Sequence, residues 1–259
     1  MNVLVIDIGG THVKVLATGQ QEPREFVSGP KLTPQEMVDA VIKVARGWTY
    51  NVISMGYPGL VLHGRVVAEP HNLGRGWVHF DYRAVFGRPV RIINDAAMQA
   101  LGSYKSGKML FLGLGTGLGS ALVVDGIVEP MELGHLPYRK GTYETYVGLG
   151  GLEKRGKKKW RRDVADVVAR LTAALEPDEV VLGGGNAKRL KELPPGSRLG
   201  KNANAFLGGI RLWNAAESTT PSPPIHREKR KEQARVEANR TRRTPRRQRP
   251  GMEGSRESQ

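Results

Sequence analysis

The sequence predicts an α/β protein built from two similar halves, and three observations favour this fold class. A strand–glycine turn–strand pattern occurs twice, at residues 3–17 and 109–124, and helical patterns follow each copy. The long spacing indicates an approximate internal duplication instead of a short-period solenoid. At 259 residues the chain is long enough for two modest lobes and a sizeable core.

The composition limits the classes of function. The chain has no cysteine, which excludes disulfides, thiolate metal sites and thiol nucleophiles. No apolar run reaches the roughly 18 residues of a membrane span, and the first strand contains Asp7, unlike a signal peptide. We therefore expect a cytoplasmic protein without a membrane segment.

The formal net charge is +15, and both main parts of the chain are basic. From Glu217 onward there are 12 Lys and Arg against 6 Asp and Glu, with almost no bulky apolar residues, which predicts a disordered tail. This tail could be a nucleic-acid-binding arm or an appendage without function, and the abrupt change after Trp213 favours the appendage. A polyanionic partner and a basic background without a partner both fit the charge.

The first half predicts strands, a glycine hairpin and helices in alternation. Gly9 and Gly10 favour a tight turn because glycine adopts the positive φ angles of a two-residue hairpin. Thr33, Pro34 and Glu36 form a capping box that starts a helix. The other expected elements are strands 3–8, 12–17, 24–28, 51–57 and 90–93, a small hairpin at 60–68 and a helix at 96–104.

The second half repeats this order. Strands are expected at 109–114 and 119–124 around a turn at 115–117, followed by a helix at 160–175 that Pro177 ends. A buried strand at 180–182 then opens into three glycines. Helices are expected at 186–193 and 203–213.

The opening hairpin combines three chemical groups around its turn. Asp7 ends the first strand, and Thr11 and Lys14 follow on the return. A carboxylate that can hold a metal, a turn with free N–H groups and a cation together suit a phosphate chain. An ordinary N-terminal hairpin is the alternative.

The dipeptide Asn94-Asp95 follows an apolar strand and precedes a helix. Open α/β sheets bind their ligands at such carboxyl ends of strands. A carboxylate there could accept the proton of an attacking hydroxyl during phosphoryl transfer. The competing interpretation is that Asp95 only caps the helix.

The glycine-rich stretch 112–120 matches neither the dinucleotide-binding fingerprint nor a P-loop. With Thr116 at its tip it resembles the opening hairpin, and two such turns facing each other would hold a phosphate chain from both sides. A glycine hairpin packed in a core is the alternative, which the presence of two copies disfavours.

Two polar segments follow. Glu132 and His135, with Glu144 after them, can accept hydrogen bonds from sugar hydroxyls, whereas a polar loop is the plain alternative and a zinc site is poorly supported without cysteine. Residues 154–162 hold seven cations in nine positions, which fits either a solvated helix face or a track for a polyanion.

With these motifs in order over residues 1 to about 214, the sequence resembles the ROK family of sugar kinases. Asp7–Lys14 resembles the first phosphate motif of the family, and residues 114–119 resemble the second. Residues 182–185 resemble the nucleotide-side glycine motif, 94–102 the catalytic segment and 132–135 the E-x-G-H signature. The resemblance implies the duplicated actin-like ATPase/hexokinase fold, with an interlobe cleft.

The implied domains are a small lobe at 1–93 with the first phosphate hairpin and a large lobe at 94–216. The tail spans 217–259, and the last helix of the large lobe is expected to pack back on the small one. Within the family the sequence is most similar to polyphosphate glucokinases, on residues 72–77, 132–138, 157–162 and 202–209.

The resemblance implies Mg²⁺-dependent transfer of a phosphoryl group from polyphosphate and/or ATP to the 6-hydroxyl of glucose, in a homodimer. Asp95 would be the general base, and Asp7 would hold Mg²⁺ partly through water and donor phosphates. The implied sugar-binding residues are Asn72, Asn94, Asp95, Glu132, His135 and Glu144. The implied donor-binding residues are Asp7, Gly9, Gly10, Thr11, Lys14, Gly115, Thr116, Gly117, Gly183, Gly184 and Gly185.

Many family members carry a cysteine-rich zinc loop after E-x-G-H, and its absence here implies that His135 faces the sugar. The alternatives are an ATP-dependent glucokinase or related hexose kinase, a non-catalytic sugar sensor on the same fold, and a nucleic-acid binder that uses the tail. The repressor branch, with an N-terminal winged helix, is disfavoured because the chain starts at the phosphate hairpin.

Overall fold

A computed structural model describes residues 1–214 of the chain. The contacts divide the chain into Met1–Ser218 and Thr219–Gln259, and the fold below is that of the first unit. The tail expected at 217–259 lies outside the described residues.

Two five-stranded sheets have the same strand order, which confirms the duplicated α/β architecture. The first sheet has the order β3-β2-β1-β4-β7 and the second β10-β9-β8-β13-β14. In each sheet a hairpin of antiparallel strands is joined to parallel strands on its other side. The first sheet comprises β1 (Val3–Ile8), β2 (His12–Ala17), β3 (Arg24–Val27), β4 (Val52–Tyr57) and β7 (Val90–Asn94). The second comprises β8 (Lys108–Leu114), β9 (Leu118–Val124), β10 (Ile127–Met131), β13 (Glu179–Gly183) and β14 (Ser197–Leu199).

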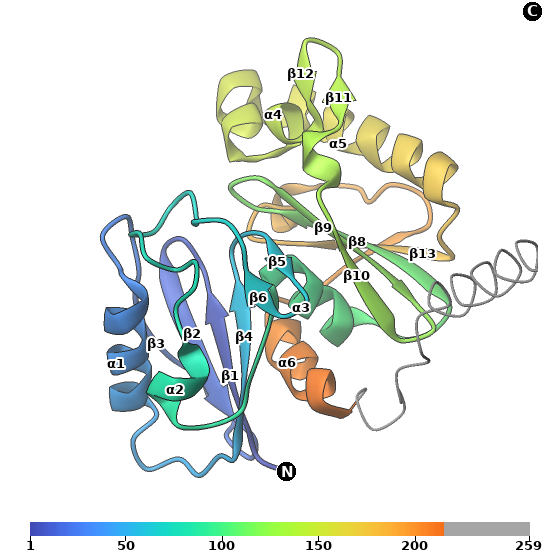
Figure 1. Cartoon of the computed structure of the whole chain (residues 1–259). Helices are drawn as coiled ribbons and strands as arrows, with labels where there is room; N and C mark the ends of the chain where they lie inside the picture. Colours follow the sequence, from blue (N-terminus) through green and yellow to red (C-terminus); the bar gives the residue numbers. More distant parts are fainter. Residues whose placement is uncertain (215–259) are drawn as a thin grey trace, which may run out of the picture. The chain divides into compact units, whose positions relative to one another are not determined.

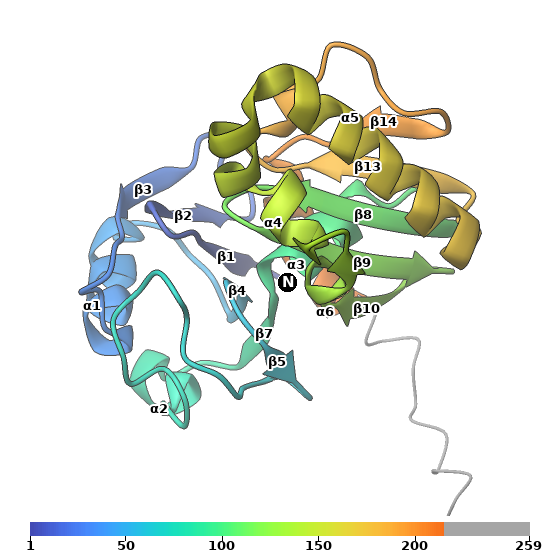
Figure 2. The ribbon, with the colours of Figure 1, turned by 90° about the horizontal axis from the view of Figure 1, so that it is seen from above.

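Helices cover both sheets (Figures 1 and 2). They are α1 (Pro34–Val44), α2 (Tyr82–Phe86), α3 (Asp95–Ser103), α4 (Tyr143–Val147), α5 (Leu149–Leu175) and α6 (Asn204–Asn214). Two short hairpins are separate from the five-stranded sheets. One consists of β5 (Val61–Leu62) and β6 (Arg65–Val66), and the other of β11 (Pro137–Tyr138) and β12 (Gly141–Thr142). The capping box expected at Thr33 and Glu36 is present at the start of α1.

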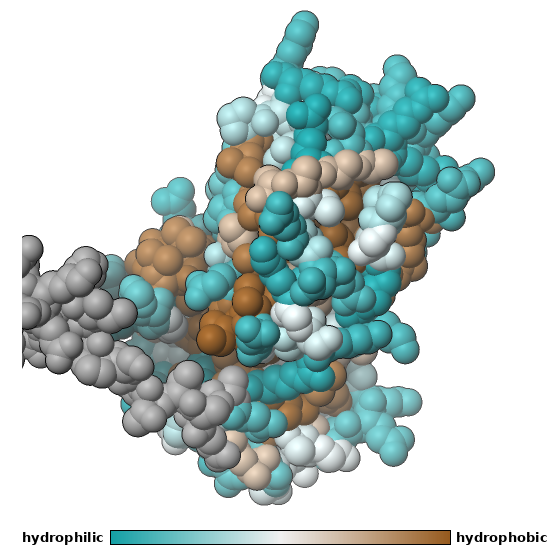
Figure 3. All heavy atoms as spheres, turned by 90° about the vertical axis from the view of Figure 1, so that its right-hand side faces the viewer, coloured by the Kyte–Doolittle hydropathy of each residue, from teal (hydrophilic) through white to brown (hydrophobic). Residues whose placement is uncertain are grey.

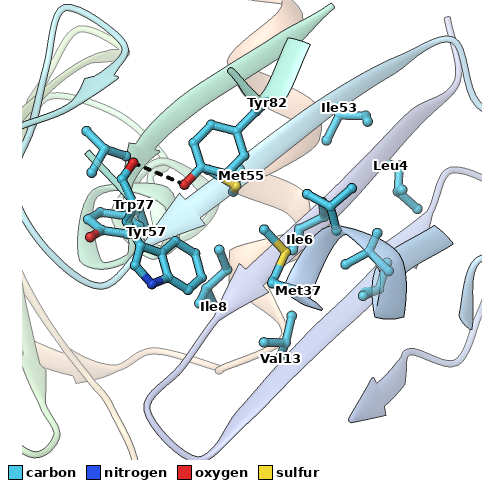
Figure 4. Packing of buried hydrophobic residues seen from close by; sticks show 14 of the residues in the cluster. Leu4, Ile6, Ile8, Val13, Met37, Ile53, Met55, Tyr57, Trp77 and Tyr82 are labelled. Atoms are coloured by element: carbon cyan, nitrogen blue, oxygen red, sulfur yellow. Dashed lines mark hydrogen bonds between the residues drawn. The ribbon is translucent and has the colours of Figure 1, made fainter. Parts of the chain in front are cut away.

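Strand periodicity assigns the two faces of the first sheet. Leu4, Ile6 and Ile8 of β1 pack with Met37 of α1 in one buried cluster (Figure 4). Val3 and Val5 belong to a second cluster, with residues of α3 and α6. Because successive side chains of a strand alternate between faces, Asp7 lies on the same face as Val3 and Val5.

The helices α3 and α6 lie between the two sheets (Figures 1 and 2). They approach so closely that a Cβ on Gly208 of α6 would overlap the carbonyl of Met98 of α3. The last helix also packs on the first sheet, where Ser54 Oγ donates to the Gly209 carbonyl at 2.6 Å and Trp213 Nε1 donates to Ser54 Oγ. The chain therefore returns from the second sheet to the first at its described end.

Two expected helices differ from the structure. The helix expected at 160–175 begins at Leu149 and contains a break at Gly156, whose φ is 74°. The run of cations masked its amphipathic pattern at the N-terminal end. The helix expected at 186–193 is a single 3-10 turn, Ala187–Arg189, which ends at Leu190, where the backbone is extended. Pro194 also disfavours a helical conformation at Leu193.

None of the described helices is long and apolar enough to cross a membrane. Figure 3 shows one face of the molecule, on which hydrophilic side chains project over the upper part, at the height where Figure 1 draws α4 and α5. Apolar patches lie between them.

Candidate active site

Two adjoining cavities lie where the sheets face each other. The larger has a volume of about 550 Å³ and the smaller about 310 Å³. Gly10, Gln99 and Gly184 line both, so the cavities meet at these three residues. The site consists of a large and a small compartment with a common wall.

Asp95 lines the larger cavity at the first residue of α3. The helix is capped by Asn94, whose Oδ1 accepts a hydrogen bond from the N–H of Ala97 at 3.1 Å, so the interpretation of Asp95 as the cap is wrong. One carboxylate oxygen of Asp95 accepts from the N–H of Ala96 at 2.8 Å.

The surroundings of Asp95 favour a proton acceptor. Burial, and next to it the charge of Asp7, raise the pKa of the Asp95 carboxyl from 3.8 to about 7, with a smaller contribution from Glu132. The hydrogen bond from Ala96 opposes the rise. A general base is most effective with a pKa near the working pH, which this carboxyl has.

The structure brings the six residues expected at the sugar together. Asn72, Asn94, Asp95, Glu132, His135 and Glu144 all line the larger cavity. Asn94 Nδ2 donates to the Gly59 carbonyl at 3.2 Å, and Glu144 Oε2 accepts from the N–H of Leu118 at 3.3 Å. These bonds fix both side chains and leave donors and acceptors for a polyhydroxyl ligand.

The first hairpin lines the smaller cavity with Asp7, Gly9, Gly10, Thr11 and Lys14. Asp7 and Lys14 are directly opposite each other in the β1–β2 register. Burial raises the pKa of Asp7 to about 6, and the Lys14 charge lowers it only in part. A carboxylate and an ammonium group thus flank a small polar cavity.

The glycines of this hairpin matter because they have no side chain, not because of unusual backbone angles. Neither Gly9 nor Gly10 has a positive φ, so the reason for which glycine was expected here is wrong. A Cβ on Gly9 would lie 2.9 Å from the His12 carbonyl oxygen, and a Cβ on Gly10 would lie 3.3 Å from Cβ of Asn72. The chain approaches itself closely at both positions, so a side chain is excluded at Gly9 unless the backbone shifts, and it would be a tight contact at Gly10.

The second hairpin lines the larger cavity through Gly115, Thr116 and Gly117. Gly184 and Gly185 line the smaller one, whereas Gly183 is buried at the end of β13, where a Cβ would overlap the ring of Phe111. The structure therefore separates the two hairpins between the two compartments, and they meet only near the common wall.

Asp7 is the residue that could hold a divalent metal in the smaller cavity. Its carboxylate is desolvated and accepts no hydrogen bond from residues 1–214, so a cation would compensate its burial. The described residues contain no group of three or more His, Asp or Glu side chains arranged around a metal. Mg²⁺ is usually held in proteins through one or two carboxylates, with water and substrate phosphates completing the octahedron.

The carboxylate of Glu69 anchors the loop that contains Asn72. Glu69 accepts hydrogen bonds at 3.1–3.3 Å from the backbone N–H groups of Gly76, Trp77 and Val78. The indole of Trp77 is fully buried below the loop and packs against Tyr57. This loop is anchored from both sides, although it has no regular secondary structure.

An ion-pair network positions the segment that carries Glu132 and His135. Asp163 of α5 is buried and pairs with Arg139 at 2.9 Å and with Arg155 at 2.7 Å. Arg139 lies in the β11–β12 hairpin that follows His135, and Arg155 precedes the break of α5 at Gly156. One carboxylate of α5 thus joins the β11–β12 hairpin to both parts of the long helix.

Three residues of the smaller cavity were not expected from the sequence: His12, Gln99 and Asn202. His12 is adjacent to Thr11, and Gln99 follows Asp95 by four positions on a helix, so a local signal was present for both. Asn202 begins the segment 202–209 that resembles the family, but no local pattern indicated that its side chain would reach this cavity.

Comparisons with known proteins agree with this geometry. The model of the ROK family matches residues 3–143. A polyphosphate glucokinase of Mycobacterium tuberculosis (strain CDC 1551 / Oshkosh) is 28% identical over 212 residues, which cover 73% of this chain and 80% of that protein. A glucokinase of Pyrobaculum calidifontis is 25% identical, over 79% of this chain and 86% of that protein.

Among solved structures, the inorganic polyphosphate/ATP-glucomannokinase of Arthrobacter sp. strain KM is similar, with a TM-score of 0.71 and 25% identity. The match covers 83% of this chain and 99% of that one. The family model spans the first hairpin, the Asn94-Asp95 segment and the Glu132–His135 segment, each of which lines one of the two cavities. The chain belongs to the ROK family.

Proposed function

We propose that the protein is a sugar kinase that phosphorylates the 6-hydroxyl of glucose. The observation that carries the proposal is Asp95, a carboxyl that lines the larger cavity and whose pKa burial raises to about 7. The relatives named as glucokinases, and the shared ROK fold, support glucose as the acceptor.

Glucose would occupy the larger cavity and the donor phosphates the smaller one. The 6-hydroxyl attacks the terminal phosphorus, a new bond forms from that oxygen to phosphorus, and the bond to the bridging oxygen of the donor breaks. Asp95 accepts the hydroxyl proton. The shortened donor leaves with the electron pair of the broken bond.

On the donor side, the chain supplies charge and backbone donors. Lys14 neutralises phosphate charge, and the free N–H groups around Gly10 and Gly184 provide hydrogen bonds. We propose Asp7 as the residue that holds Mg²⁺, directly or through water. When bound, the ion would neutralise donor phosphate charge and orient the phosphates.

Polyphosphate is the donor that the smaller cavity favours. The described residues that line it carry carboxylate, ammonium, imidazole, amide, hydroxyl or glycine groups, so His12 is the one ring among them, and none offers a Phe, Tyr, Trp or large aliphatic side chain to a purine base. An uncharged base gains most from stacking and apolar contact, whereas a phosphate chain needs only charge and hydrogen bonds. ATP remains the second candidate, since the glucomannokinase that resembles this chain is named for both donors.

The test is the formation of glucose 6-phosphate with polyphosphate and with ATP, measured side by side at equal concentrations of terminal phosphate. We expect product with both and a higher kcat/KM with polyphosphate. A chain that binds glucose but forms no product with either donor would instead be a sugar sensor. Removal of residues 217–259 should leave the activity unchanged, whereas a nucleic-acid binder that uses the tail would lose its salt-dependent affinity.

We further propose a homodimer of chains with lobes divided near residue 93. Light scattering of the purified protein tests the oligomeric state.

A further inference from the structure

Gln99 has no role in the proposed reaction so far, yet it lies where donor and acceptor must meet. It follows Asp95 by four residues on α3, and residues so spaced lie on the same helix face one turn apart. Gln99 lines both the larger and the smaller cavity. The two other residues with this property, Gly10 and Gly184, have no side chain.

The amide of Gln99 is available for a ligand. It is half-buried, and within residues 1–214 it makes no side-chain hydrogen bond. Its oxygen lies beside the end of β13, where it would be 3.4 Å from a Cβ on Gly183. Rotation of the amide by 180° presents its NH₂ group at the same point, so either end can face the cavity.

A neutral donor suits this position better than a charged one. Asp7 and Asp95 interact electrostatically across the site. A lysine or arginine here would pair with Asp95 and lower its pKa, which would weaken the base. A carboxylate would repel the donor phosphates. An amide can donate to a phosphate oxygen without disturbing either.

We propose that Gln99 binds the phosphoryl group in transfer, by donating a hydrogen bond from Nε2 to a non-bridging oxygen of the terminal phosphate. This inference rests on the proposed kinase function. Gln99 would then contact the transferred group where the two compartments meet, with Asp95 on one side and Lys14 on the other.

The test compares Gln99→Met and Gln99→Glu with the wild type, using tripolyphosphate and ATP as donors. Loss of a hydrogen bond to a charged group is worth about 1.5–3 kcal/mol, which corresponds to roughly 10–100-fold in rate. We expect Gln99→Met to lose about this factor in kcat, and Gln99→Glu to lose more because of repulsion. The KM for glucose should change less than threefold for both.

A matched control is Gln20→Glu, which makes the same change in an exposed turn between β2 and β3. It should retain wild-type rates. Thermal unfolding and binding of tripolyphosphate, followed by calorimetry, check that each Gln99 variant is folded and report a weakened donor affinity without turnover.

Two results overturn the inference while the proposed kinase stands. One is a Gln99→Glu enzyme with wild-type kcat, and the other is a variant whose loss appears only in the KM for glucose. If instead the wild type forms no glucose 6-phosphate, the proposed function itself fails.

Discussion

The two glycine hairpins are similar in sequence and topology, but the structure gives them different chemistry. In the β1–β2 hairpin, Asp7 and Lys14 are paired across the two strands and line the smaller cavity. In the β8–β9 hairpin no charged residue lies in the turn, and the nearest carboxylate is that of Glu144, which comes from α4.

The second hairpin acts through its backbone and its packing. A Cβ on Gly117 would overlap the Glu144 carboxylate, and a Cβ on Gly119 would lie 2.8 Å from Cβ of Ala96, next to Asp95. The first hairpin therefore presents charged side chains to the smaller cavity, whereas the second lines the larger cavity and packs against the start of α3. The two turns share a fold but differ in the chemical groups that they present.

The largest difference between the two hairpins is expected at Asp7. Asp7→Asn removes the proposed Mg²⁺ ligand, and we expect kcat to fall roughly 10²–10³-fold, because a metal supplies several kcal/mol of transition-state stabilisation. The loss should persist at saturating Mg²⁺. If excess Mg²⁺ fully restored activity, Asp7 would contribute only to the affinity for the metal. An unchanged rate would contradict its proposed role as a Mg²⁺ ligand.

Lys14→Met tests the cation of the same hairpin. Loss of one charged hydrogen bond to phosphate should reduce kcat/KM for the donor roughly 10–100-fold. The KM for glucose should stay constant, because Lys14 lines only the smaller cavity. Steady-state kinetics with each substrate varied in turn separates the two effects, and an equal rise in both KM values would contradict the division into compartments.

In the second hairpin, crowding should matter more than the loss of any side chain. Gly119→Ala places a methyl group against Ala96 and should destabilise the fold by about 1–3 kcal/mol. Gly115→Ala is the matched control for stability, because no atom lies within 4 Å of its Cβ position and its φ is not positive. Equal unfolding temperatures for the two variants would show that the hairpin does not support α3.

The smallest effect is expected at Asp163. Asp163→Asn should cost about 1–2 kcal/mol of stability, less than the roughly 3–5 kcal/mol of a fully buried pair, because Arg139 and Arg155 are 48% and 29% exposed. The segment of Glu132 and His135 loses its anchor, so the KM for glucose should rise a few-fold at constant donor KM. Asp166→Asn is the control at a more exposed partner of the same arginine.

Local patterns were sufficient to predict much of the fold and of the site. Both hairpins, the capping box of α1 and the strand–helix junction at Asp95 could be predicted, because each depends on residues close in sequence. At that junction Asp95 was expected either as a base or as the cap, and the structure shows that Asn94 is the cap.

What could not be predicted depends on contacts between distant segments. The role of Asp163 requires Arg139 and Arg155 to converge on it from a hairpin and a broken helix. The separation of the two hairpins between compartments, and the arrival of Asn202 at the smaller one, follow from the packing of the sheets. The glycines of the first hairpin were expected for their φ angles, but neighbours brought in by tertiary structure explain them.

The turnover of Asp95→Asn tests the central claim most directly. The raised pKa means that the native carboxyl keeps its proton up to about pH 7, whereas the unfolded one loses it near 3.8. The wild-type protein therefore loses stability as the pH rises from about 4 to 7. Asparagine carries no charge to bury, so the variant should unfold at a higher temperature than the wild type at pH 8. That shift serves as the control for an intact fold.

With the fold intact, we expect glucose 6-phosphate formation by Asp95→Asn to fall roughly 10²–10⁴-fold or more at every pH, the usual contribution of a general base. The wild-type rate should rise with pH up to about 7 and then level, as Asp95 ionises. Near-normal turnover of the folded variant would contradict the assignment of Asp95 as the base.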